Sequence, residues 1–328
     1  MNPADEPLGP LPGLSDAELP FPGRARLREH LVREAHSAPA PARSRRRAAL
    51  LLAAGAAACA VTLAVTLGAA GPGGPPAAAP PDPAAVRLLD RVALTAQEAP
   101  APAVRDGQFL YTRTTGHSTA LSEVPGGAME ASRTDESGER WLSVDGSAAP
   151  VERTAEGGTR TLPWDGENRA TLNSPTYRFL ESLPTDPGRL LELIYADTRL
   201  NHGPGSGSTL GPDQAAFVAI GDLLRRMEAP PGVSAALYRA AARIPGVVLV
   251  PEATDAAGRT GVAVARVHGG ERTEWIFDRS SLRLLGERTV LLVDGAWGKA
   301  GTAVTSVAVV GRGVSDRAGE TPALVRPW

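Results

Sequence analysis

The chain has 328 residues, a formal net charge of −2 and 42% hydrophobic residues. This near-neutral charge gives no electrostatic basis for binding nucleic acid, so we expect no nucleic-acid partner. The single cysteine, Cys59, excludes an intrachain disulfide and a zinc site built from cysteines. A folded part of this chain must therefore be held together by its own hydrophobic core.

Residues 1–47 are predicted to form a mostly disordered tail, because proline and acidic residues are frequent there and large apolar residues are rare. A short helix is predicted near residues 23–35, where Leu27, Leu31 and Ala35 share one face at i, i+4 spacing. Two interpretations of this face stay open. It belongs either to a solvated helix beside a membrane or to a surface that binds a cytoplasmic protein partner.

An uncharged apolar run extends from Ala48 to Ala70. As a helix it is long enough to cross a hydrocarbon core of about 30 Å, so we predict a transmembrane helix with the lipid bilayer as partner. Four arginines lie within residues 43–47, whereas the next basic residue after the run is Arg87. The positive-inside rule then predicts a cytoplasmic N-terminus and an extracytoplasmic C-terminal domain at the cell membrane. Cleavage after Ala70, as in a signal peptide, is the alternative.

Residues 71–83 form a linker rich in proline, glycine and alanine, and residues 84–313 are predicted to form the extracytoplasmic domain. Its first helix is predicted from Asp82 to Glu98, with Asp82 as N-cap and Pro83 at the first helical position. Period-two segments with β-branched and aromatic residues then predict strands. These segments are 108–115, 129–134, 139–144, 150–154 and 159–162.

Helical periodicity occupies the middle of the domain, in segments near 177–183, 187–195, 213–227 and 232–244. Period-two segments return at 247–250, 260–267, 272–278, 282–293 and 302–312. The order predicts an α+β domain: a curved antiparallel sheet with a helical insertion packed on one face. We expect both strand sets to join one continuous sheet, because the first set has too few large apolar residues for a core of its own. Residues 314–328 show no core pattern and are predicted to form a disordered tail.

Motifs that carry catalysis are not found in the sequence. No nucleophile elbow and no phosphate-binding Gly-x-x-x-x-Gly-Lys loop occurs, and the five histidines are scattered without metal-ligand spacing. We therefore predict no catalytic residue, no cofactor and no metal site, and expect a non-enzymatic domain. Five aromatic residues alternate along the predicted strands and either line a groove for an apolar ligand or pack in the core. They are Phe109, Tyr111, Trp141, Trp275 and Phe277.

Several stretches together resemble an uncharacterised family of actinobacterial single-pass membrane proteins. They are Glu18–Leu31, Phe179–Pro187, Gly221–Gly246, Glu274–Asp278 and Leu285–Val290. The resemblance covers nearly the whole chain and implies a membrane protein with no established activity, so it assigns no functional residues. More distantly, a helix followed by aromatic strands is similar in pattern to the curved-sheet domains of lipoprotein carriers and of a periplasmic regulator of anti-sigma factors.

Three hypotheses for function follow. The first is a non-enzymatic sensing or binding module outside the membrane that signals through the tail helix. The second is a carrier or scavenger of an apolar ligand such as a lipid or a lipoprotein, which a pocket lined by strand aromatics would favour. The third is a cell-envelope hydrolase, which clustered carboxylates with perturbed pKa values would favour.

Overall fold

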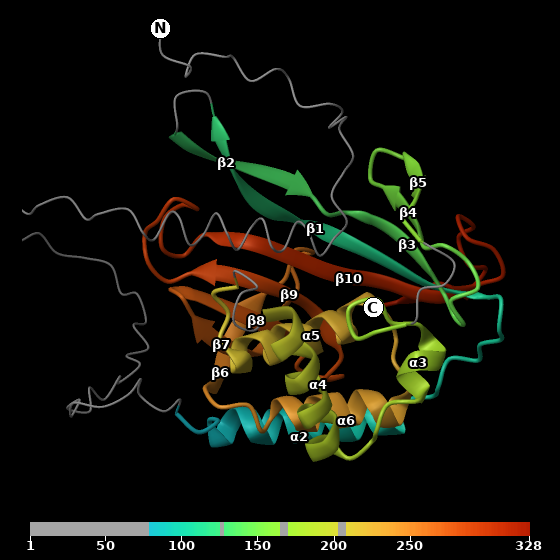
Figure 1. Ribbon diagram of the computed structural model, residues 1–328, viewed down its shortest axis with the longest axis horizontal. Coiled ribbons are helices and arrows are strands. Elements are labelled where there is room, and N and C mark those ends of the chain that lie inside the picture. Colours follow the sequence, from blue (N-terminus) through green and yellow to red (C-terminus); the bar gives the residue numbers. More distant parts are fainter. Residues whose placement is uncertain (1–78, 125–127, 165–169, 203–207) are drawn as a thin grey trace, which may run out of the picture.

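The computed structural model describes residues 79–124, 128–164, 170–202 and 208–328 (Figure 1). The tail face of Leu27, Leu31 and Ala35, the predicted span from Ala48 to Ala70 and most of the linker lie outside these residues and stay predictions. Within the described ranges, no helix combines the length and apolar character needed to cross a membrane.

Eleven strands of the described residues form one antiparallel sheet. The strands before the helices are β1 (Phe109–Val124), β2 (Ala128–Asp135), β3 (Gly138–Ser143), β4 (Val151–Thr154) and β5 (Thr159–Thr161). Those after the helices are β6 (Val247–Thr254), β7 (Thr260–His268), β8 (Glu271–Phe277), β9 (Leu284–Leu291), β10 (Ala303–Ser315) and β11 (Arg326–Pro327). Their order is β5-β4-β3-β1-β10-β9-β8-β7-β6, with β2 paired to β1 and β11 paired to β10.

The first strand and the longest late strand join the two strand sets. β1 pairs with β10 from Phe109 opposite Ser315 to Ser118 opposite Thr305, with one irregularity after Arg113. The prediction of a single continuous sheet is therefore confirmed. β1 also continues beyond β10 and forms a two-stranded ribbon with β2 that projects from the sheet (Figure 1).

Within the part of the chain that the structure describes, five helices form the other layer, below the sheet in Figure 1. They are α2 (Pro83–Glu98), α3 (Tyr177–Glu181), α4 (Pro187–His202), α5 (Pro212–Arg226) and α6 (Pro231–Ala241). The start of α2 follows the sequence prediction, because Asp82 accepts a hydrogen bond from the amide of Ala84 at 2.9 Å and Pro83 is the first helical residue.

The main core lies between the helices and one face of the sheet. Its centre is a stack of Trp275 from β8 on Phe217 from α5, with ring centroids 4.0 Å apart and planes 5° apart. Phe277 meets Tyr238 of α6 edge to face at 5.8 Å. These large rings are buried between the sheet and the helices.

Residues 314–328 do not form the disordered tail that we expected. The β9–β10 ladder ends at the pair Gly286–Ala308, and β11 pairs with β10 at Gly311 and Arg312 instead. The Trp328 indole donates to the carbonyl of Leu284 at 2.6 Å. The prediction failed because these residues pair with backbone groups of β10 that β9 no longer pairs with. Such backbone groups need a hydrogen-bond partner, but no local sequence pattern shows where that partner comes from.

Candidate functional site

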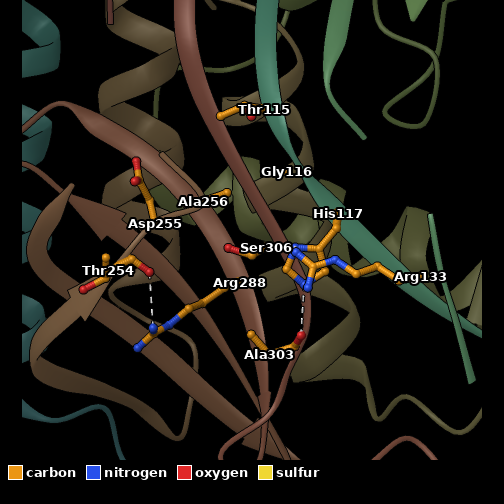
Figure 2. A pocket seen from close by; sticks show the side chains of 10 residues that line it. All are labelled: Thr115, Gly116, His117, Arg133, Thr254, Asp255, Ala256, Arg288, Ala303 and Ser306. Carbon is orange, nitrogen blue, oxygen red and sulfur yellow. Dashed lines mark hydrogen bonds between the residues drawn. The ribbon is translucent and has the colours of Figure 1, made fainter. Parts of the chain in front are cut away.

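A cavity of about 360 Å³ opens on the face of the sheet opposite the helices (Figure 2). The β1–β2 ribbon forms one wall, the turn between β6 and β7 forms the other, and β9 and β10 contribute side chains between them. Its lining residues are Thr115, Gly116, His117, Arg133, Thr254, Asp255, Ala256, Arg288, Ala303 and Ser306.

The strand register brings the polar side chains of the cavity together. His117 lies opposite Ser306, Ser306 opposite Arg288, and Arg288 opposite Glu274, so the four form one row across β1, β10, β9 and β8. Because neighbouring residues on a strand point to opposite faces, this row shares the outer face while Trp275 points into the helix core.

His117 is held by both ring nitrogens. Its Nε2 lies 3.1 Å from the carbonyl oxygen of Ala303, and its Nδ1 lies 2.8 Å from Nη2 of Arg133. A carbonyl accepts and a guanidinium donates, so in these two contacts Nε2 is the donor and Nδ1 the acceptor. In this arrangement His117 has no free nitrogen with which to activate the hydroxyl of Ser306.

Arg288 is oriented by a buried carboxylate. Glu274 is fully buried and accepts from Nε of Arg288 and from Nε of Arg272, each at 2.6 Å. Nη1 of Arg288 also donates to the carbonyl of Thr254 at 3.2 Å, across the cavity wall (Figure 2). These contacts fix the guanidinium against the wall, since charge-assisted bonds of this kind are short and directional.

The carboxylate in the lining is already engaged. Oδ1 of Asp255 accepts from the amides of Ala257 and Arg259 at 2.9 Å each, and Oδ2 accepts from Nε of Arg259 at 2.8 Å. Its side chain is fully buried. Asp255 therefore shapes the β6–β7 turn and compensates Arg259. The arginines of the cavity lining are Arg133 and Arg288, and the single charge of Glu274 is shared between Arg288 and Arg272.

An adjoining hollow of about 410 Å³ shares Gly116, His117 and Arg133 with this cavity and adds Asp135. Oδ1 of Asp135 accepts from the amide of Ser137 at 2.8 Å. Hydrogen bonds from the Ser137 side chain and backbone lower the pKa of Asp135, so it stays ionised at neutral pH. The cationic character is therefore stronger on the Arg288 side than at this outer edge.

The five strand aromatics, for which an apolar groove and core packing were both open, do not come together in one groove. Trp275 and Phe277 lie in the helix core, whereas Phe109, Tyr111 and Trp141 form a separate cluster on the opposite face. All five are buried, and none lines either cavity. The period-two pattern predicted the strands correctly, but it did not show which face each strand turns towards the helices.

The separate cluster is covered by the residues after β10. Ala318 and Val325 pack against it, and the Trp141 indole donates to the carbonyl of Glu320 at 2.8 Å. Burial, followed by a hydrogen bond to Glu139, raises the pKa of Tyr111 well above its usual range. These rings therefore serve packing in this structure.

The cavity residues carry no motif that sequence inspection could have found. His117 was one of five scattered histidines, and Arg133, Arg288 and Ser306 come from three different strands. Within the described ranges, no three His, Cys, Asp or Glu residues lie close enough to hold a metal ion. Comparison with known proteins adds nothing to this assignment, since no family model, no curated protein and no solved structure matches the chain.

Proposed function

We propose that this chain is a membrane-anchored binding module whose extracytoplasmic domain takes up a small anion in the cavity beside His117. The observation that carries the proposal is the pair of guanidinium groups, Arg133 from β2 and Arg288 from β9, on either side of a polar cavity whose lining carboxylate is already satisfied. The anchor in this proposal is the apolar run from Ala48 to Ala70.

The chemistry of the lining favours a carboxylate or a phosphate group. Guanidinium groups bind both in a planar, two-point geometry, and Ser306 and Thr115 add hydroxyls that donate or accept. The cavity volume of about 360 Å³ lies at the lower end of the range for small-molecule sites. A small ligand that carries carboxylate or phosphate groups fits these limits.

The other two hypotheses have less support. An apolar carrier needs exposed apolar walls, whereas the strand aromatics are buried in packing. A hydrolase that uses Ser306 needs a free base beside it, whereas both nitrogens of His117 are engaged. If the module is also a sensor, we propose that it signals through the tail face of Leu27, Leu31 and Ala35.

Titration calorimetry of the full chain in detergent micelles tests the proposal, with inorganic phosphate and citrate as probes. Arg133→Met is the main variant, because Arg133 is exposed and we expect surface substitutions of this kind to leave the fold intact. Arg239→Met is the matched control, since Arg239 lies on α6 in the helix layer and contacts Gln97. We expect saturable binding of at least one probe, weakened about tenfold by Arg133→Met and unchanged by the control. Equal binding by all three proteins, or no binding of either probe, overturns the proposal.

A further inference from the structure

Three aliphatic side chains are exposed at one end of the sheet. Val267 at the end of β7 is 45% exposed, and Leu292 and Val293 after β9 are 39% and 57% exposed. We call these three residues the apolar tip. Natural surfaces tolerate single exposed apolar residues, but neighbouring ones indicate an interaction site.

The three residues of the tip are neighbours in the fold. The amide of Leu292 donates to the carbonyl of Gly270 in the β7–β8 turn at 2.8 Å. Val293 lies over the same glycine, because a Cβ at Gly270 would be 2.8 Å from its Cγ2. Val267 pairs with Arg272 immediately after this turn. The tip is therefore formed where the β7–β8 turn and the β9–β10 connection lie side by side.

The described chain begins at the same end of the sheet. The carbonyl of Ala79 accepts from the amide of Gly246 at 2.7 Å, and the amide of Asp82 donates to the carbonyl of Val247 at 2.8 Å. Val247 in turn lies opposite Arg266, next to Val267. Figure 1 shows the start of α2 on the same side of the molecule as the ends of β7 and β9.

The distance to the predicted membrane span is short. The apolar run ends at Ala70, so only residues 71–78 separate it from the first described residue. Fully extended, this stretch reaches at most roughly 30 Å. β10 has 13 residues, so the far end of the sheet lies roughly 40 Å further away. Among the surfaces described, the tip lies at the end closest to the bilayer.

We infer that the apolar tip docks on the phospholipid surface and places Val267, Leu292 and Val293 in the boundary between headgroups and acyl chains. This inference depends on the proposed membrane anchor. The tether supplies the bilayer at high local concentration, so a small apolar contact is sufficient for binding. Docking would hold one end of the sheet at the membrane and restrict how the domain moves on its linker.

Fluorescence quenching in lipid nanodiscs tests the inference on the full chain. Cys59→Ser first removes the only cysteine, and Val293→Cys then carries an environment-sensitive dye. Leu324→Cys is the control, because Leu324 is also exposed, at 72%, but lies far from the tip. Its carbonyl is beside Gly313, and β10 begins at Ala303, near the tip, roughly 30 Å away along the strand. With doxyl-labelled phosphatidylcholine and phosphatidylglycerol, we expect the dye at position 293 to be quenched at least threefold more than the dye at 324.

The outcomes separate the inference from the anchor. If the chain stays in the nanodisc and both dyes are quenched equally, the tip does not dock and the inference is wrong. If the dye at 293 is protected from water but not quenched, and protection requires two copies per disc, the tip binds a second chain and the lipid inference is also wrong. If the chain dissociates from nanodiscs and is extracted by alkaline carbonate, the anchor itself has failed.

Discussion

Replacing Gly221 with alanine should destabilise the domain although it improves helix propensity. A Cβ on Gly221 in α5 would lie 2.4 Å from Nε1 of Trp275 and 2.8 Å from Oε2 of Glu287. Trp275 cannot easily move away, because it is 1% exposed and stacked on Phe217 at 4.0 Å. The extra methyl group therefore has to displace either the indole or the helix.

Two opposing contributions set the size of the effect. Alanine in the interior of a helix is favoured over glycine by about 1 kcal/mol. Overpacking a tight core costs about 1–3 kcal/mol, and a contact of 2.4 Å against a stacked ring places this site at the upper end. We expect a net loss of about 2 kcal/mol, which lowers Tm by roughly 4–8 °C in a domain of this size.

Gly232→Ala provides the matched control. Gly232 also lies in a helix, α6, but its added Cβ would meet only Cγ2 of Thr185 at 3.4 Å, an ordinary contact. This variant should be as stable as the parent or more stable, by up to about 1 kcal/mol. Thermal and urea unfolding of the full chain, followed by tryptophan fluorescence, compares the two. Equal stability of both variants would refute the packing argument.

Three further predictions concern two carboxylates and the segment after β10, residues 316–328, which we call the covering segment. Burial raises the pKa of Asp145, but hydrogen bonds from the amide and hydroxyl of Ser147 outweigh it and hold the pKa at about 2. The ionised Asp145 should thus stabilise the fold by about 1–2 kcal/mol above pH 4, and this contribution should be lost as the pH falls towards 2. Urea unfolding at a series of pH values checks this, because Asp145→Asn should remove this part of the pH dependence of the free energy of unfolding. Glu274→Gln removes the buried countercharge of Arg288, so it should lower the free energy of unfolding by about 3 kcal/mol. Calorimetry should nevertheless show tighter binding of phosphate or citrate, because the charge of Arg288 is then less compensated. Weaker binding by a folded variant would contradict the proposed site. Trp328→Ala removes the indole that bridges to β9, so it should lower stability by about 2–3 kcal/mol in thermal unfolding, and an unchanged Tm would show that the covering segment contributes little.

Local signals were sufficient for the helices and for most strands. Asp82 followed by Pro83 predicted the start of α2, and the structure confirms both the cap and the first turn. The length of β1 was underestimated, since the predicted strand ended at Thr115 whereas β1 runs to Val124. Residues 116–124 are mostly polar, and they remain extended because β2 supplies a pairing partner rather than because of their own pattern.

Longer-range consequences were harder to predict. The expectation that the two strand sets share one sheet was correct. It followed from the shortage of large apolar residues in the first set, which can be counted without knowing how the strands are aligned. For the five strand aromatics, the sequence left a groove and core packing open, and the structure agrees with packing: Tyr111 and Trp275 are buried on opposite faces of the sheet. A shift of one residue in register exchanges the two faces of a strand, so alternation alone cannot decide between them.

From the sequence alone, the α+β class, the order of strands, helices and strands, and the joining of both strand sets could be determined, because periodicity, caps and the total supply of apolar residues are properties of the sequence. Only the tertiary structure decided the cavity, the β11 pairing and the apolar tip. His117 and Ser306 are 189 positions apart and meet through the register of β1 on β10. Such contacts depend on how distant strands align, and no local pattern carries that information.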